Sequence, residues 1–549
     1  MIPTDAPQRF TRLFPWIAGP LFFGLFAILM GQDANWDLRN YHLYNPFALL
    51  NNRLGHDMLP AGVANFYNPL LHVPFYWAVM SLPPMLTGFL LGAVQGLNFP
   101  ILIGITRSIM EEGRIRPAWH SYLAAFIGML GAGAIAELGT TFGDNLISLL
   151  FLGALWLIIA NFTTNFHHLG EKRTAKILLI MGAAGILCGM ATGLKQPSAI
   201  FAVGCCTAFL IVPVPFVRRI ILAFCFGIGV LTGFAITGGF WMHELWVHYG
   251  NPLFPYFNDF FQSPMGAAAS YRDTKFIPSS LFDALFLPFL IVMNPYRVGE
   301  ASFQDLRFIL LILTLVTTAF FVIKKSPAPE QAPSTLARQK GNFLLAAMLI
   351  SYLVWLKLFA IYRYLLPLEM LAPLAIWLLI DRFPVRIQAR NITIFACMAI
   401  WLITLRPGNW VRKPWSNDYF GVTPPVLTDP DNTMVIMTGM EPMSYFIPFF
   451  PESVRFIRIV SYFTGPTETP NGFDLAMRQA ITEHQGPKYV LYRSNDEEGN
   501  LFALQHYNLE LNAEECRSLH PTIEGADEAP FRFCPVIPKT PLTSKRTQQ

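Results

Sequence analysis

The chain has 549 residues, of which 53% are hydrophobic and 13% are charged, and its mean hydropathy is +0.41. Soluble domains have about 25% charged residues, so this composition indicates an integral membrane protein rather than a soluble one. The net charge of +4 comes from scattered pairs of basic residues, which is too little to predict nucleic-acid binding. We therefore expect membrane lipids, and no nucleic acid, among its partners.

Apolar stretches of spanning length recur from the N-terminus to residue 405. The first follows Arg9 and Arg12 and has no small-residue cleavage site after it, so we predict an anchor rather than a removed signal peptide. The whole pattern predicts a polytopic α-helical membrane protein with about 11 transmembrane helices. The predicted spans are 14–31, 86–106, 118–136, 145–162, 176–193, 198–216, 220–241, 306–323, 342–360, 364–381 and 391–405.

Lysine and arginine residues favour alternate loops. Pairs such as Arg218 and Arg219 lie on the side of the N-terminus, which holds about twice as many basic residues as the other side. Basic loops stay in the cytoplasm, so we predict a bacterial inner-membrane protein with a cytoplasmic N-terminus and with loops 32–85 and 242–305 outside. Leu281–Met293 is too short to span and is predicted to be re-entrant or interfacial. If it crosses the membrane, the C-terminus is cytoplasmic.

From Arg406 onward the chain alternates strand-like and helix-like segments. TMVIMTG, VRFIRIVSYF and KYVLYR predict strands, and EPMSYFIPFF, GFDLAMRQAITEHQG and EEGNLFALQHY predict helices. This alternation predicts a small extracytoplasmic, periplasmic α/β domain with a mainly parallel sheet over 406–549, following a transmembrane domain over 1–405. Cys516 and Cys534 lie outside the apolar spans, and we predict that they form a disulfide in this oxidising compartment.

Charged residues are concentrated in the loop after the first span. The segment GQDANWDLRNYHLYNP contains Asp33, Asp37, Arg39, Tyr41 and His42. Packing explains such a group poorly, because carboxylates, guanidinium and imidazole groups all prefer bulk water to a lipid boundary. We therefore predict a reaction site in this loop.

Further charged residues are predicted at the outer ends of spans. Asp144 opens a helix after GTTFG, where capping explains it as well as function does. Lys195 in GMATGLKQP and Arg363 in IYRYLLPLE either anchor helix ends or bind a lipid phosphate, and we prefer phosphate. Glu244 lies between two histidines that lack the spacing of a zinc-protease motif, which favours an aromatic interface belt over a metal or acid/base set.

The order of these motifs resembles the GT-C superfamily of polytopic glycosyltransferases, which includes bacterial relatives of protein mannosyltransferases and lipid A aminoarabinose transferases. The first outer loop of that superfamily carries a catalytic acid followed by interfacial helices. Asp33, Asp37 and the aromatic, proline-containing segment 45–85 match this pattern, and we prefer interfacial helices there to an irregular loop. GTTFGDNLISLLFLGALWL, GMATGLKQP and IYRYLLPLE are similar to its acidic, lysine and late arginine motifs. Many members have adjacent acids, whereas Asp33 and Asp37 are four residues apart, so both remain candidate bases.

The resemblance implies an enzyme that transfers a sugar from a polyprenyl-phosphate-linked donor to a lipid, glycan or protein acceptor on the extracytoplasmic face. Asp37, favoured over Asp33, would be the general base, and Lys195 and Arg363, or a bound divalent metal ion, would stabilise the leaving phosphate. The residues expected to bind the sugar or the acceptor are Arg39, Tyr41, His42, Asp144 and Glu244. The alternatives are an O-antigen-type polymerase or ligase with diphosphate donors, and a transporter of lipid-linked sugars, which the lack of a clear sequence repeat disfavours.

Overall fold

The computed structural model describes residues 6–112, 118–164, 170–327, 329, 332–467, 469–525 and 527–539, with only the backbone described for 6–12. The chain forms two compact units. The first unit comprises Met1–Gly31, Gly88–Phe240 and Asp273–Arg412. The second comprises Gln32–Thr87, Trp241–Arg272 and Lys413–Gln549, so it groups the segment after the first helix with the C-terminal residues.

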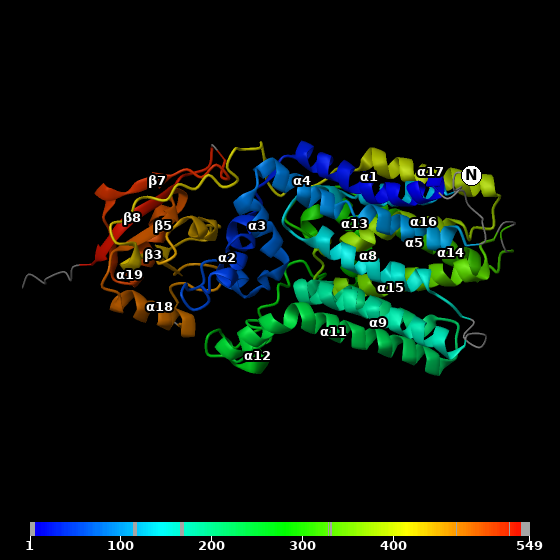
Figure 1. The fold of residues 1–549 in the computed structure, drawn as a ribbon, viewed down its shortest axis with the longest axis horizontal. Helices are drawn as coiled ribbons and strands as arrows, with labels where there is room; N and C mark the ends of the chain where they lie inside the picture. The colour runs from blue at the N-terminus through cyan, green and yellow to red at the C-terminus, as the bar shows by residue number, and fades with distance from the viewer. Residues whose placement is uncertain are drawn as a thin grey trace, which may run out of the picture. The chain divides into compact units, whose positions relative to one another are not determined.

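Most of the described chain is helical (Figure 1). The α-helices are α1 (Ala6–Met30), α2 (Tyr44–Leu50), α3 (Val73–Ser81), α4 (Pro84–Gln95), α5 (Asn98–Met110), α6 (Trp119–Met129), α7 (Ala132–Ala136), α8 (Asp144–Ala160), α9 (Glu171–Leu194), α10 (Ala199–Ala208), α11 (Phe216–Tyr249), α12 (Asn258–Phe261), α13 (Leu281–Met293), α14 (Arg307–Ile323), α15 (Thr335–Leu358), α16 (Leu366–Ile380), α17 (Ile387–Thr404), α18 (Gly472–Glu483) and α19 (Glu497–His506). The strands are β1 (Gln32–Asp33), β2 (Arg412–Lys413), β3 (Met434–Met437), β4 (Arg455–Arg458), β5 (Lys488–Arg493), β6 (Leu509–Leu511), β7 (Arg517–Leu519) and β8 (Phe531–Pro538).

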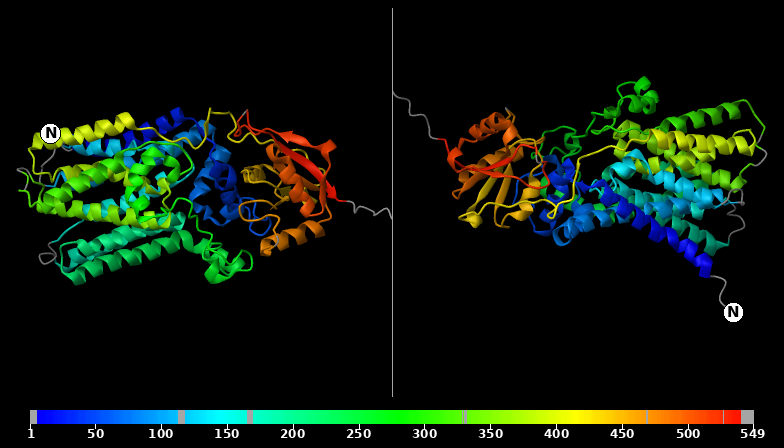
Figure 2. Two further views of the ribbon diagram at one scale, coloured as in Figure 1. Left: turned by 180° about the vertical axis from the view of Figure 1, so that it is seen from behind. Right: turned by 90° about the horizontal axis from the view of Figure 1, so that it is seen from above.

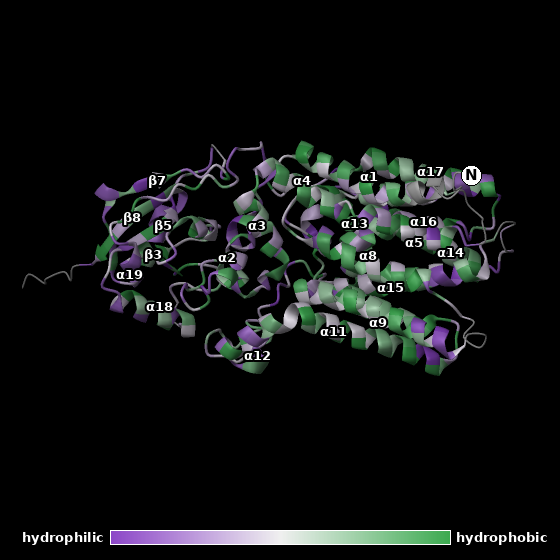
Figure 3. Ribbon diagram, viewed as in Figure 1, coloured by the Kyte–Doolittle hydropathy of each residue, from purple (hydrophilic) through white to green (hydrophobic). Residues whose placement is uncertain are grey.

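The long helices have the composition of membrane spans. Seven helical stretches among the described residues are long and apolar enough to cross a membrane: Leu13–Met30, Pro84–Met110, Glu171–Leu194, Phe216–Tyr249, Thr335–Leu358, Tyr362–Ile380 and Ile387–Thr404. Figure 3 shows hydrophobic residues along the length of these helices. Shorter apolar helices include α8, α13 and α14. The chain therefore has the character of a polytopic membrane protein, and the count of about 11 spans remains a prediction.

Helices α9 and α11 lie side by side and contact each other through glycines (Figures 1 and 2). A Cβ atom added to Gly185 or Gly189 would lie 2.0 Å from the carbonyl oxygen of Phe226 or Val230, respectively. Only glycine allows the two backbones to approach this closely. Such small-residue interfaces are typical of helices in lipid, where van der Waals packing drives association.

Helix α16 lies at the centre of the first unit. All of its residues, Leu366–Ile380, are buried. It contacts α5, α6, α7, α8, α14, α15 and α17. A helix that is apolar almost all round is expected to be surrounded by other helices, and α16 fits this expectation, with Glu369 as its one charged residue.

The predicted span 118–136 is interrupted in the structure. Helix α6 ends at Met129 and α7 begins at Ala132, which leaves the N–H groups of the new helix start without intrahelical partners. Carboxylates from elsewhere in the unit accept these hydrogen bonds. Asp305 Oδ2 accepts from the Ala132 N–H at 3.0 Å, and Glu369 accepts from the N–H groups of Gly133 and Ala134 at 3.2 and 3.1 Å.

An arginine completes this arrangement, and we call Asp305, Arg307 and Glu369 the buried arginine cluster. The Arg307 guanidinium lies 2.8 Å from an Asp305 carboxylate oxygen and 3.9 Å from one of Glu369, and all three side chains are fully buried. The guanidinium carbon also stacks 3.7 Å from the ring centroid of Trp401. Gly131 is needed at the break, because a Cβ there would lie 1.4 Å from Glu369 Oε1.

The second unit contains a mixed sheet in the order β4-β3-β5-β8-β6, with β7 paired to β8. Strand β3 is parallel to β4 and β5, and β8 is antiparallel to β5, β6 and β7. One face packs against α18 and α19, which lie along the strands in Figure 2, in a shared hydrophobic core. The predicted strands around β3, β4 and β5 and the predicted helices α18 and α19 are confirmed. The antiparallel β8 was not predicted, because its proline-containing sequence lacks a clean strand pattern. The prediction of a mainly parallel sheet is therefore wrong, since β8 makes three antiparallel pairings beside two parallel ones.

The segment after the first helix belongs to this second unit through direct contacts with the sheet. The Met58 N–H donates to the Phe456 carbonyl at 2.8 Å, and the Arg458 N–H donates back to Met58 at 2.9 Å. Arg53 is held by a salt bridge to Asp57 at 2.6 Å and donates to the Val454 carbonyl. Met58 therefore forms a single parallel bridge with Ile457 of β4. The short helices α2 and α3 follow the predicted helical character of segment 45–85.

The predicted disulfide between Cys516 and Cys534 is confirmed. It is compatible with an extracytoplasmic location, and it joins the residue before β7 to β8. The other cysteines, Cys188, Cys205, Cys206, Cys225 and Cys397, are free.

We expect reduction of this bond to lower the stability of the second unit by about 3 kcal/mol, because it releases a loop of about 18 residues in the unfolded chain. Thermal unfolding of the detergent-solubilised chain with and without reductant measures this difference. The double variant Cys516→Ser/Cys534→Ser is the control, and it should unfold at the reduced temperature and show no response to reductant. If this variant still unfolded at a lower temperature in reductant, the effect would not come from the bond between Cys516 and Cys534.

Candidate functional site

The predicted site residues fall into two groups, one in each compact unit. In the first unit, Asp144 is the first residue of α8 and Lys195 follows the last residue of α9. Arg363 lies in a short 3-10 helix, Tyr362–Leu365, that leads into α16. The motifs that contain these three residues are far apart in the sequence, and the residues line one cavity in the fold. Together with Glu137, we call these residues the Lys195 cluster.

Lys195 makes the central contacts of this cluster. Its Nζ lies 2.6 Å from Asp144 Oδ2 and donates to the Phe142 carbonyl at 2.9 Å. The guanidinium carbon of Arg363 lies 4.9 Å from the ring centroid of the same Phe142. Tyr364 lies between the two cations, 5.3 Å from Lys195 Nζ and 5.5 Å from the Arg363 guanidinium carbon. Two fixed cations therefore share one small, aromatic-walled space.

Glu137 is a member of this cluster that the sequence analysis did not single out. It follows α7, its side chain is 1% exposed, and its two carboxylate oxygens have no hydrogen-bond partner among the described residues. Burial raises the pKa of Glu137 well above its usual value, and the nearby charge of Asp144 adds to the shift, while Lys195 and Arg363 oppose it. The signal was present in the sequence, because AIAELG places an acid directly after an apolar run at the predicted outer end.

The Lys195 cluster combines two basic side chains with two acids. Lys195 and Arg363 are the basic groups, Asp144 is paired with Lys195, and burial raises the pKa of Glu137. The cavity lined by Asp144, Lys195 and Arg363 measures about 10 Å³, enough for roughly one water molecule. The space beside the Lys195–Asp144 ion pair is therefore almost completely filled by protein atoms.

In the second unit, the two candidate bases differ in their surroundings. Asp33 is 1% exposed, and its carboxylate oxygens accept hydrogen bonds from the Asn35 side-chain amide at 2.8 Å each. The Asn35 carbonyl oxygen in turn accepts from the Leu38 N–H at 2.8 Å, which closes a local turn. Asp37 is only half-buried and precedes the π-helix Leu38–His42. The geometry thus gives Asp33 a structural role and leaves Asp37 accessible.

Arg39, predicted to bind sugar or acceptor, is 6% exposed and forms an ion pair with Glu524. Arg493 also contacts Glu524 and lies 2.8 Å from Glu528. Burial raises the pKa of Glu524 despite these cations. Burial alone would also raise the pKa of Glu528, but the hydrogen bond from Glu524 and the charges of Arg39, Arg493 and Lys413 lower it to about 2. Arg39 therefore connects its segment to the C-terminal residues.

Tyr41 and His42 belong to a group of stacked rings. The His42 ring lies 3.9 Å from that of His72 with nearly parallel planes, and Tyr41 meets His42 edge-on at 4.3 Å and Tyr67 at 5.2 Å. His42 and His72 are both buried. The aromatic contacts therefore join residues of the segment after the first helix to one another.

Glu244 lies near the end of α11, where it is exposed and 3.8 Å from the His248 ring nitrogen. Among the described residues, no group of three or more His, Cys, Asp or Glu side chains is arranged to hold a metal ion. In the Lys195 cluster the carboxylate of Asp144 is already paired with a cation, which does not fit a divalent-ion site. No step of the mechanism is therefore assigned to a metal ion.

Comparison with known proteins adds no family to this picture. No protein-family model matches the chain, and no curated protein matches it. The GT-C resemblance rests on the sequence motifs alone.

Proposed function

We propose that this membrane protein is a GT-C-like glycosyltransferase of the bacterial inner membrane, which moves a sugar from a polyprenyl-phosphate donor to a lipid, glycan or protein acceptor in the periplasm. The observation that supports it most is the Lys195 cluster. Asp144, Lys195 and Arg363 come from three separate motifs of the resemblance, and the fold brings them together at one end of α8, α9 and α16.

In this proposal the cluster binds the donor phosphate. A polyprenyl-phosphate sugar is a phosphodiester with one negative charge, which the cations Lys195 and Arg363 would complement. Arg363 would contact the phosphate with its forked N–H groups, and Lys195 would exchange Asp144 for a phosphate oxygen. When the sugar–oxygen bond breaks, the leaving phosphate gains negative charge, which both cations stabilise.

The acceptor side of the reaction is assigned to the segment after the first helix. Asp37 would remove the proton of the acceptor hydroxyl while that oxygen attacks the sugar C1, in a single displacement that inverts the anomeric centre. Tyr41 and His42 would supply an aromatic surface for the sugar. Polymerase, ligase and transporter functions remain rivals, and binding of a monophosphate in preference to a diphosphate would argue against the first two.

The test is phosphate-dependent lipid binding. A polyprenyl phosphate without sugar should bind the solubilised protein, and the corresponding polyprenyl alcohol should bind much more weakly. We expect Lys195→Ala and Arg363→Ala each to weaken phosphate binding by about tenfold or more, because a hydrogen bond to a charged group contributes about 1.5–3 kcal/mol. Arg363→Lys keeps the charge but loses the forked N–H groups. Its affinity for polyprenyl phosphate should therefore lie between that of the parent protein and that of Arg363→Ala.

The matched control is Lys275→Ala, which removes an exposed cation of the same unit. It should bind polyprenyl phosphate like the parent protein. Equal affinity in Lys195→Ala, Arg363→Ala and the control would return both residues to a role in anchoring helix ends, and the proposal would lose its main support.

A further inference from the structure

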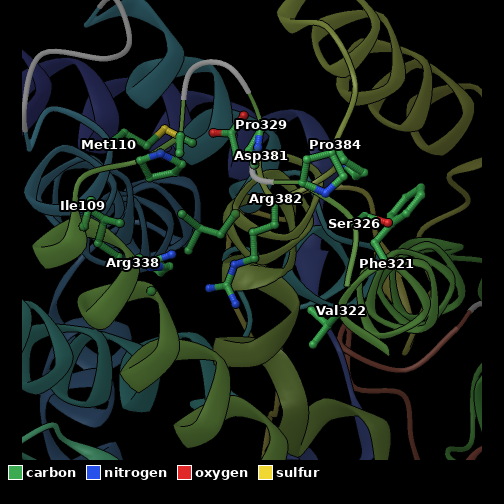
Figure 4. Close-up of a pocket in the computed structure, with 16 residues that line it drawn as sticks. Ile109, Met110, Phe321, Val322, Ser326, Pro329, Arg338, Asp381, Arg382 and Pro384 are labelled. Atoms are coloured by element: carbon green, nitrogen blue, oxygen red, sulfur yellow. The ribbon is translucent and has the colours of Figure 1, made fainter. Parts of the chain in front are cut away.

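A second pocket lies at the end of α16 opposite the Lys195 cluster (Figure 4). The ends of α5, α14 and α16 and the start of α15 form it, and its cavity measures about 270 Å³. Much of its lining is apolar, including Met110, Phe321, Val322 and Leu378. The positive-inside distribution of basic residues predicts that this end of the helices is cytoplasmic.

Two arginines give this apolar pocket a positive charge. Arg338 comes from α15 and Arg382 follows α16, and Figure 4 shows both side chains at the pocket. The Arg382 guanidinium donates to the Asn342 side chain at 2.8 Å. Burial and then the charge of Arg338 lower the pKa of Arg382 from its usual value, so the two guanidinium groups lie close enough to repel each other.

Among the described lining residues, the arginines outnumber the acids. Asp381 is the one acid in the described lining, and it is 6% exposed. Lys340, on the same helix as Arg338, lies 2.9 Å from Glu112, so that pair is neutral. The described lining therefore holds two guanidinium groups against one carboxylate.

The pocket borders an exposed apolar surface on α14. Val322, which lines the pocket, is 70% exposed, and its neighbours Ile323 and Phe320 are 79% and 50% exposed. In a membrane protein such a strip faces lipid. A ligand that fills the pocket can therefore combine a phosphate at the arginines with a hydrocarbon chain along α14.

We propose that this pocket binds the phosphate of an anionic membrane phospholipid. Arginine forks match phosphate oxygens, and basic pockets between transmembrane helices on the cytoplasmic side are suited to acidic lipid headgroups. The continuity with the lipid-facing strip of α14 favours a lipid over a free phosphate ion. This inference concerns a site apart from the Lys195 cluster and does not depend on the proposed transfer reaction.

Native mass spectrometry of the full chain, purified with phosphatidylglycerol or phosphatidylcholine, tests the proposal. We expect retention of phosphatidylglycerol, and Arg338→Gln/Arg382→Gln should weaken it by about tenfold or more, since each basic residue near a lipid surface contributes about 1 kcal/mol. The control Lys172→Gln/Arg173→Gln removes two exposed cations from the start of α9 and should bind as the parent does. Arg338 is exposed, so the single variant Arg338→Gln tests the same site without changing the half-buried Arg382.

Thermal unfolding of the same proteins distinguishes a lipid phosphate from a free phosphate ion as the ligand. Phosphatidylglycerol should raise the melting temperature of the parent and the control but not of the double variant, whereas inorganic phosphate and phosphatidylcholine should have little effect. Stabilisation by inorganic phosphate equal to that by phosphatidylglycerol would overturn the lipid assignment. Undiminished phosphatidylglycerol retention in Arg338→Gln/Arg382→Gln would overturn the site.

Discussion

Replacing Asp37 by asparagine should lower sugar transfer by at least about a hundredfold, because it removes the proposed proton acceptor while keeping the shape of the side chain. Asp37 is half-buried at the start of the π-helix Leu38–His42, where an acceptor hydroxyl can approach it. Since the change is isosteric and at an accessible position, the variant should unfold at the same temperature as the parent and bind polyprenyl phosphate equally well. Transfer of radiolabelled sugar, normalised to folded protein, measures the effect.

Two comparisons make this experiment decisive. Asp33→Asn should behave differently, because Asp33 is buried and accepts two hydrogen bonds from the Asn35 amide. Asp33→Asn would leave an N–H donor of Asn35 without its acceptor, which should lower the free energy of unfolding by about 1–3 kcal/mol. Asp259→Asn removes an exposed carboxylate of α12 and should change neither transfer nor stability. If Asp33→Asn abolishes transfer and Asp37→Asn does not, the roles are reversed. If both keep transfer, the segment is not the catalytic one.

Replacing Arg307 by methionine should destabilise the first unit by about 3–5 kcal/mol, because it leaves the carboxylates of Asp305 and Glu369 buried together without a countercharge. The loss should appear as a large fall in melting temperature and in the yield of folded protein. A triple variant that also carries Asp305→Asn and Glu369→Gln removes the stranded charges and should recover part of the loss.

The control for this prediction is Arg297→Met. Arg297 also pairs with a carboxylate, Asp283, at 3.0 Å, but its side chain is 38% exposed. An exposed pair contributes little to stability, so this variant should unfold near the parent temperature. Equal losses in Arg307→Met and Arg297→Met would mean that burial of the arginine cluster does not set its contribution to stability.

Local sequence patterns were sufficient for the elements of this protein but not for its long-range charge contacts. Continuous apolar runs predicted helices such as α9 and α15, and MVIM predicted the buried strand β3. Each of these predictions depends only on residues that are close together in the sequence. The break between α6 and α7 was missed. It depends on acceptors at Asp305 and Glu369, which are more than 170 residues away in the chain.

The same distinction applies to the candidate site. Lys195, Asp144 and Arg363 were predicted to lie on one side of the membrane, because the order of the spans is enough for that inference. The ion pair between Lys195 and Asp144, and the position of Arg363 in the same cavity lining, were beyond it. Arg39 was predicted to bind a ligand, and its pairing with Glu524, 485 residues later, has no local signature. Long-range ion pairs of this kind become visible only when the fold is known.

The complete burial of α16 constrains how its sequence can vary. A helix at the edge of a bundle tolerates changes on its lipid-facing side, so acceptable substitutions recur with the helical period. Leu366–Ile380 has no such side, because every residue is packed against protein. A cavity or an overpacked contact is therefore expected wherever a substitution is made, with losses of about 1–5 kcal/mol for changes in size. In a family of related sequences, α16 should appear as an unbroken block of restricted positions, whereas the exposed face of α14 should drift freely.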